Sequence, residues 1–179
     1  MGKNGIMKKI YLDRLESKDA ISVFIKNAEV IPAGATLYTM SVEYKNEDYQ
    51  KYEDNYDLKF IFDNDIPQID FYTVPRIDIF AQDSLGGLFG TIGEATDIDN
   101  NASICYINKN KECFSIADSL KAFLKVLESE PDWRKNITPN NNVTFYKSRE
   151  DAMKNLEFLE IPTKTTNQLT ASSWRITPD

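Results

Sequence analysis

The stretch from residue 72 to residue 127 constrains the fold most, because it combines strand-like runs, a glycine-rich turn and the clearest helical pattern. A short apolar run over residues 78–81 predicts a strand, and the polar, glycine-containing residues 83–87 predict a tight turn directly after it. Glycines then recur at every third residue, which favours a closely packed strand because each glycine inside a helix would cost about 1 kcal/mol. These glycines are Gly87, Gly90 and Gly93.

Two further β-prone runs follow, at residues 103–107 and 112–116, and the polar residues 108–111 join them. This arrangement is typical of a β-hairpin. The two cysteines of the chain, Cys105 and Cys113, both lie in it. We expect them to be reduced, partly buried thiols, since a cytoplasmic compartment disfavours disulfides.

The segment after the hairpin has the pattern of an amphipathic helix. Ser115 as N-cap and Asp118 as the acid of a capping box predict that the helix begins near Ile116. Apolar side chains at three- and four-residue spacing predict one buried face that anchors a sheet, whereas Lys121 is expected to face solvent. The apolar set is Ala117, Leu120, Phe123, Leu124 and Leu127.

Weaker patterns on both sides of this stretch add further elements. Helices are predicted over residues 17–28 and from Ser148 to Pro162, and strands are predicted over residues 36–44, 58–62, 69–74 and 143–146. The expected fold class is therefore α+β, a mostly antiparallel sheet flanked by helices. The expected organisation is a single domain over residues 1–162 followed by a C-terminal tail over residues 163–179.

Residues 46–57 form the most ambiguous segment, which we interpret as a short helix or an ordered loop with Asn46 as its cap. Its tyrosines fall at helical spacing among acids. They could form an interface, because tyrosine joins a rigid apolar body to a polar tip, or they could pack on the domain core. If a partner binds here, the expected contact residues are Glu47, Asp48, Tyr49, Tyr52, Glu53, Asp54 and Tyr56.

The formal charge of −7 is concentrated between residues 43 and 70, where nine acids stand against three lysines. No run of Lys or Arg follows Lys8 and Lys9, so a nucleic-acid partner is not expected and a basic protein partner is favoured. No apolar run approaches the length of a membrane helix, and the N-terminus lacks the apolar core of a signal peptide. We therefore expect a cytoplasmic protein with no membrane association. Nothing in the sequence sets the oligomeric state.

The chain contains no histidine, which removes the usual general base and the commonest metal ligand. Ser84 lies in a sequence that superficially resembles a nucleophile elbow, but the first glycine and a base are missing. Asp97, Asp99 and Asn101 match part of a calcium loop that lacks its glycine and its closing glutamate. We expect no cofactor, no metal and no catalysis. An enzyme that uses Glu94, Asp97 and Asp99 as an acidic cluster is the alternative from a different class.

Three segments together resemble the SUKH superfamily, which includes a yeast cell-wall synthesis regulator and many bacterial immunity proteins. The similar segments are the strand and acidic-glycine turn over residues 79–90, the strand at residues 104–107, and the helix over residues 116–124, which carries an "IA-D-S" start and a "F-L" pair. The resemblance implies an α+β domain that binds another protein and performs no chemistry.

The expected function is therefore that of a non-catalytic, immunity-type protein that binds and neutralises a toxin domain. A regulatory adaptor of the cell-wall-regulator type is the alternative that the same resemblance offers.

Overall fold

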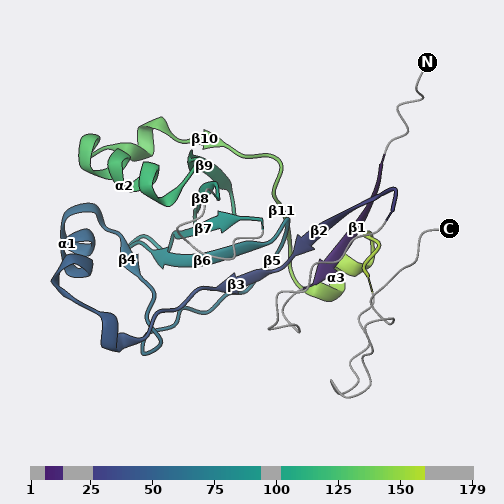
Figure 1. Ribbon diagram of the computed structural model, residues 1–179, viewed down its shortest axis with the longest axis horizontal. Coiled ribbons are helices and arrows are strands. Elements are labelled where there is room, and N and C mark those ends of the chain that lie inside the picture. The colour runs from purple at the N-terminus through teal and green to yellow at the C-terminus, as the bar shows by residue number, and fades with distance from the viewer. Residues whose placement is uncertain (1–6, 14–25, 94–101, 160–179) are drawn as a thin grey trace.

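A computed structural model describes residues 7–13, 26–93 and 102–159. The fold is α+β, as the sequence predicts, with a mostly antiparallel sheet and helices packed beside it. In Figure 1, helices α1 and α2 lie at one end of the central sheet, while β1, β2 and α3 lie at the other end.

The first half of the chain contains β1 (Lys8–Asp13), β2 (Ala28–Ala33), β3 (Ala35–Leu37), the 3₁₀ helix η1 (Val42–Tyr44), α1 (Glu47–Tyr56), β4 (Lys59–Phe60) and β5 (Tyr72–Val74). The second half contains β6 (Ile77–Gln82), β7 (Leu88–Ile92), β8 (Ile104–Ile107), β9 (Cys113–Ala117), α2 (Leu120–Ser129), the 3₁₀ helix η2 (Trp133–Asn136), β10 (Thr138–Pro139), β11 (Thr144–Tyr146) and α3 (Arg149–Met153).

The central sheet has the order β10-β9-β8-β7-β6-β3, and β4 pairs with β6 outside this path. Every pairing in it is antiparallel except β3 with β6. The predicted strand at residues 78–81, the turn after it and the hairpin around residues 108–111 are all confirmed. Consecutive antiparallel strands need only short local connections, which is why the sequence marks them well.

Close packing is confirmed for two of the three regularly spaced glycines, Gly87 before β7 and Gly90 within it, whereas a Cβ on Gly93 would meet nothing within 4 Å. A Cβ on Gly90 would lie 2.5 Å from Ile77 Cγ2 and 3.0 Å from the carbonyl oxygen of Asp78, and a Cβ on Gly87 would overlap the ring of Tyr106. Only a residue without a side chain fits at either position.

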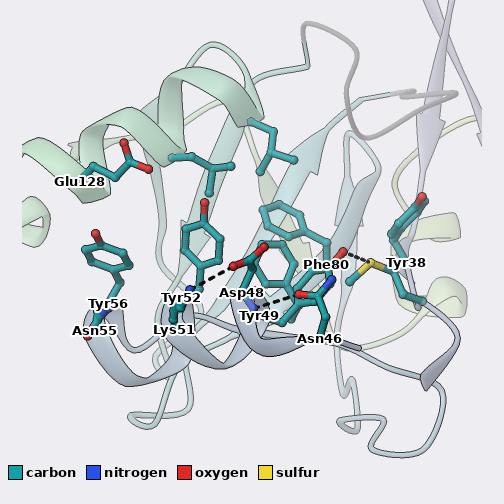
Figure 2. A pocket seen from close by; sticks show the side chains of 14 residues that line it. Tyr38, Asn46, Asp48, Tyr49, Lys51, Tyr52, Asn55, Tyr56, Phe80 and Glu128 are labelled. Atoms are coloured by element: carbon teal, nitrogen blue, oxygen red, sulfur yellow. Dashed lines mark hydrogen bonds and ion pairs between the residues drawn. The ribbon is translucent and has the colours of Figure 1, made fainter. Parts of the chain in front are cut away.

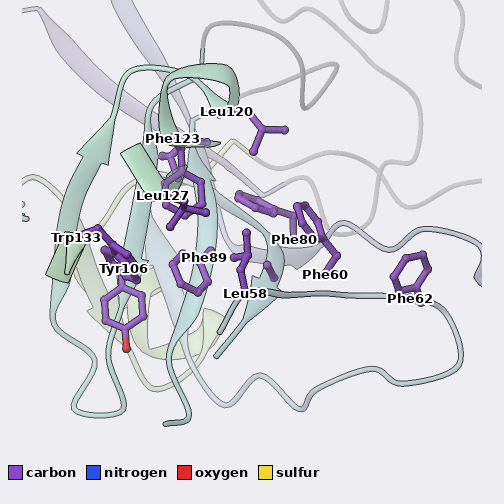
Figure 3. Packing of buried hydrophobic residues seen from close by; sticks show 12 residues of the cluster. Leu58, Phe60, Phe62, Phe80, Phe89, Tyr106, Leu120, Phe123, Leu127 and Trp133 are labelled. Atoms are coloured by element: carbon purple, nitrogen blue, oxygen red, sulfur yellow. The ribbon is translucent and has the colours of Figure 1, made fainter. Parts of the chain in front are cut away.

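Both faces of the central sheet are buried, because successive side chains of a strand point to opposite sides. On β8, Ile104 and Tyr106 join an aromatic cluster under α1 and α2, while Cys105 and Ile107 join an aliphatic cluster on the other face. Figure 3 shows the aromatic cluster, in which α2 directs Phe123 and Leu127 towards the sheet. Phe89, Tyr106, Phe123 and Trp133 have ring centroids 5.1 to 6.2 Å apart where they meet.

The two cysteines are buried free thiols, as expected. An interaction with Cys113, together with full burial, raises the pKa of the Cys105 thiol. Cys105 therefore stays protonated at neutral pH, and a protonated, inaccessible thiol is a poor nucleophile.

A third cluster lies at the opposite end, where β1 and β2 form a parallel pair and β11 pairs with β5. Its buried members are Ala33, Tyr72, Val74 and Ala152. The predicted strand at residues 143–146 is confirmed as β11. The helix predicted from Ser148 to Pro162 does begin at that cap, but α3 ends at Met153 and does not reach the apolar residues Leu156 and Leu159, which the prediction includes.

The predicted start of the helix after the hairpin, near Ile116, is wrong. Residues near Ile116 belong to β9, which pairs with β8 through Ala117, and Ser115 accepts a hydrogen bond from Asn140 instead of capping a helix. Ser119 is the N-cap, and its side chain accepts from the N–H of Ala122 at 3.1 Å. Ladder hydrogen bonds to a neighbouring strand outweighed a local capping signal.

Several other predicted elements are longer than the observed ones or lie outside the described residues. The strand predicted over residues 36–44 is the short β3, followed by η1, which Ser41 caps. The strands predicted over residues 58–62 and 69–74 shrink to β4 and β5. The helix predicted over residues 17–28 lies largely outside the described residues, and its last residue, Ala28, begins β2. The predicted tail over residues 163–179 also lies outside them.

Candidate functional site

Helix α1 confirms the helical interpretation of residues 46–57. The side chain of Asn46 accepts from the N–H of Asp48 at 2.9 Å, and two acids in the first turn complement the positive end of the helix dipole. Asp57 ends the helix in a left-handed conformation with φ of 55°. The capping signal at Asn46 thus correctly marks the start of this helix.

The tyrosines of α1 pack on the core, so the core-packing interpretation is confirmed. Tyr49 meets Phe60 and Phe62 edge to face, at centroid distances of 5.3 and 5.2 Å. Tyr52 meets Phe60 at 5.8 Å in the same manner. All three tyrosines remain half-buried, however, so part of each ring is still available at the surface.

The exposed sides of these tyrosines form one wall of a groove of about 640 Å³ between α1 and α2. Figure 2 shows Tyr56 opposite Glu128 at one end of the groove, and Asn46 and Tyr38 at the other end. The lining residues are Tyr38, Met40, Asn46, Asp48, Tyr49, Lys51, Tyr52, Asn55, Tyr56, Phe60, Phe80, Leu120, Leu124 and Glu128. This groove, defined by those residues, is the candidate functional site.

Helix α2 supplies the opposite wall through Leu120, Leu124 and Glu128, which follow one another at four-residue spacing. A smaller hollow continues the groove over Lys121 and Lys125 of the same helix. Leu124 is half-buried and packs in part against the aromatic cluster, so the expectation that it belongs to the buried face is confirmed only in part. The rest of its side chain presents apolar surface to the groove.

Four of the seven predicted contact residues line the groove, namely Asp48, Tyr49, Tyr52 and Tyr56, and the other three do not. Those three are Glu47, Glu53 and Asp54, which belong to the same helix. Sequence reasoning missed the α2 wall and the two residues between the helices that form the floor, Phe60 and Phe80. No local signal could have placed α2 beside α1, because α2 lies more than 60 residues further along the chain.

The hydroxyl of Tyr52 is held in its neutral form. Burial raises its pKa above the ordinary value, and the nearby carboxylates Glu128 and Asp48 raise it further. At Tyr52 the groove therefore offers a neutral phenol that can donate or accept a hydrogen bond at physiological pH.

Several other acids between residues 43 and 70 are engaged within the chain. Asp57 accepts from the N–H and the hydroxyl of Ser84, at 2.9 and 2.8 Å. Asp65 pairs with Lys59 at 2.5 Å, and Asp70 pairs with Lys111 at 3.4 Å. The negative surface is thus smaller than the count of acids suggests, and its exposed remainder is concentrated on α1.

A second polar cluster surrounds Asp83, whose side chain is fully buried. Its carboxylate accepts from the Tyr106 hydroxyl at 2.7 Å, from Arg134 Nη2 at 2.8 Å and from the N–H groups of Leu85 and Gly87 at 3.0 and 2.6 Å. Burial works to raise the pKa of Asp83, but these donors outweigh it and hold the pKa below its usual value. Burial and the adjacent carboxylate raise the pKa of Tyr106 to about 12.

The Asp83 cluster connects several structural elements. Both oxygens of the Asp83 carboxylate accept hydrogen bonds inside it, so this carboxylate has a structural role. Ser84 donates its hydroxyl to the carboxylate of Asp57, the residue that ends α1.

Glu94, Asp97, Asp99 and Asn101, which carry the enzyme and calcium alternatives, lie outside the described residues. Among residues 7–13, 26–93 and 102–159, no group of three or more acids or cysteines could hold a metal ion. In the same part of the chain, no helix is long and apolar enough to cross a membrane.

Comparison of the chain with protein-family models, with curated proteins and with solved structures gives no match. The resemblance to the SUKH superfamily therefore stays a prediction, based on the segments named for it and on the α+β fold that it implies.

Proposed function

We propose that this chain is a non-catalytic protein-binding domain that binds a toxin domain in the cytoplasm and neutralises it, with the groove between α1 and α2 as its contact surface. One observation carries the proposal: three half-buried tyrosines and Leu124 present a continuous apolar surface between two helices, beside an acidic helix face. The toxin-neutralising role rests on the resemblance to immunity proteins.

The tyrosines suit a protein interface. Their rings are already fixed by contacts with Phe60 and Phe62, so binding would cost them little further conformational entropy. Tyrosines, which join a rigid apolar ring to a polar hydroxyl, are typical of residues that dominate binding energy.

The charge of α1 favours a basic partner. The helix carries four carboxylates against one lysine, and Glu47, Asp48 and Asp54 are exposed. A negative patch of this kind attracts a positively charged protein and speeds its association.

The test is co-expression with the protein encoded by the adjacent reading frame, followed by purification and titration calorimetry. We expect a stable complex and protection of the host cell from that protein. Leu124→Glu should weaken the complex at least tenfold, because it places a carboxylate on the apolar wall. Met153→Glu is the matched control, since Met153 is also partly exposed on a helix but lies at the far end of the fold.

The absence of both a complex and protection would refute the toxin-neutralising role. Equal binding by Leu124→Glu and wild type would place the interface away from the groove.

A further inference from the structure

The architecture of the groove limits what can occupy it. Both walls are helices, and each contributes side chains from successive turns: Tyr49, Tyr52 and Tyr56 from α1, and Leu120, Leu124 and Glu128 from α2. The α1 wall spans 10 residues, which corresponds to about 15 Å at 1.5 Å per residue. A partner segment of about three helical turns matches this length.

The backbone of the walls excludes an extended occupant. Backbone groups within α1 and α2 bond along their own helices, and those of Tyr38 and Met40 already donate to Ile79 and Ile61. A bound strand would therefore find no ladder partner, and its N–H and C=O groups would lie unpaired against Phe60 and Phe80. A helix satisfies its own backbone and can present only apolar side chains to this floor.

The two helices that form the rims carry opposite net charge, because α1 has four carboxylates and one lysine, whereas α2 has two lysines and one carboxylate. On the α1 side, Asp48 and Lys51 line the groove and pair with each other at 3.4 Å, a contact that solvent screens. The negative charge of this rim therefore comes from the other three acids of the helix, Glu47, Glu53 and Asp54. On the α2 side, Lys121 and Lys125 are exposed, and neither forms an ion pair within the described residues. A partner that fits both rims therefore needs basic groups along one flank and acidic groups along the other.

We infer that the occupant of the groove is a single amphipathic helix of the partner protein, with an apolar stripe facing the tyrosines, a basic flank against α1 and an acidic flank against Lys121 and Lys125. This inference rests on the proposed function, in that it takes the groove to be the contact surface. It adds the secondary structure of the bound segment and its charge pattern.

The probes are three fluorescein-labelled, helix-forming peptides of about three to four turns that share one stripe of Leu and Trp at three- and four-residue spacing. The first has Lys on one flank and Glu on the other, the second has Lys on both flanks, and the third has Glu on both. Fluorescence anisotropy measures their affinity for the full chain. Binding should be tightest for the first peptide and about fivefold or more weaker for the other two, since in each of them one flank meets like charge.

Charge reversal on the protein provides the sharpest test. In the double variant Lys121→Glu and Lys125→Glu, both rims become acidic, so the peptide with two Lys flanks should become the tightest binder. Both lysines are exposed, so the fold should tolerate the change. Lys109→Glu with Lys147→Glu is the matched control on other exposed lysines, and it should keep the wild-type preference.

A peptide of the same composition but scrambled order, which has no stripe, should not bind. Equal binding of the scrambled peptide, or an unchanged preference in the double variant, would overturn the inference. Self-association of the chain through the groove, seen by sedimentation and abolished by Leu124→Glu, would also overturn it, because a second copy would then be the occupant.

The two proposals fail separately. If the adjacent-frame protein is bound through the groove but no peptide binds, the helical occupant is wrong and the proposed function stands. If the peptides behave as expected but the adjacent-frame protein is neither bound nor neutralised, the toxin-neutralising role is wrong and the specificity of the groove stands.

Discussion

Asp83 shows how one residue of the acidic-glycine turn connects several elements. Its carboxylate binds the two N–H groups that shape the turn between β6 and β7, the hydroxyl of Tyr106 on β8 and the guanidinium of Arg134 on η2. Arg134 also lies 3.6 Å from Asp57 at the end of α1, and its guanidinium carbon lies 4.5 Å from the ring centroid of Trp133. The α1 wall of the groove is thus attached to the sheet through this cluster.

Asp83→Asn should destabilise the fold by about 3 kcal/mol. The amide loses the charge that Arg134 needs and turns an NH2 group towards donors that require an acceptor. Urea titration at pH 7 measures the loss. Asp54→Asn is the control, because Asp54 is exposed and accepts a side-chain hydrogen bond from Gln50 of the same helix, and it should change stability by less than about 0.5 kcal/mol. Similar losses in both variants would contradict the structural role of Asp83.

The same substitution has a pH signature. Because the folded pKa of Asp83 lies below that of the unfolded chain, its contribution is fully present above the unfolded value of about 4 and is lost as the pH falls through the folded value. The stability difference between wild type and Asp83→Asn should therefore be constant near neutrality and shrink on acidification below about pH 4. A difference that grew in acid would mean that the pKa shift has the opposite sign.

At the scale of elements, α2 divides its apolar residues between two tasks. Phe123 and Leu127 are buried against the sheet, Leu120 is buried and also lines the groove, and Leu124 is half-buried between the core and the groove. An apolar stripe on a helix predicts that all four side chains contact other apolar groups. It does not show which of them pack on the core of the same chain and which remain available to a partner.

This division predicts unequal effects of truncation. Leu127→Ala should cost about 2 to 5 kcal/mol, because Leu127 is 1% exposed and its loss leaves a cavity under the helix. Leu124→Ala should cost less than half as much, and Lys121→Ala should have almost no effect. Urea titrations of the three variants at one pH make the comparison. Equal effects of Leu127→Ala and Leu124→Ala would mean that the helix is rotated relative to the described orientation.

At the scale of the whole molecule, the acids of α1 create a negative electrostatic field that acts on a partner protein before the two make contact. Replacing Glu47, Asp48, Glu53 and Asp54 together by their amides should lower the on-rate for the adjacent-frame partner and flatten its dependence on ionic strength. Tyr52→Ala should mainly raise the off-rate, because it removes contact area. Stopped-flow fluorescence at several salt concentrations separates the two effects.

The control for this field is Glu29→Gln with Glu150→Gln, which neutralises two exposed acids on β2 and α3 at the other end of the fold. It should alter the on-rate much less. An unchanged on-rate and salt dependence in the α1 amide variant would place the interface elsewhere. The acids of α1 would then be only a solvent-exposed face with no role in binding.

The sequence by itself determined the elements whose signals are local. The turn before Gly87, the hairpin around residues 108–111 and helix α1 behind Asn46 follow from glycine conformation, β propensity and capping, each of which acts over a few residues. The α+β class followed from these elements in combination.

Tertiary structure decided what depends on residues far apart in the chain. Pairing with β8 extended β9 over the predicted start of α2, and packing brought Leu124 and Glu128 opposite Tyr52 and Tyr56 to form the groove. Arg134 reached Asp83 across 51 residues. Patterns along the sequence show that a side chain needs an apolar neighbour or an opposite charge, but which neighbour it meets is settled only when the whole core packs.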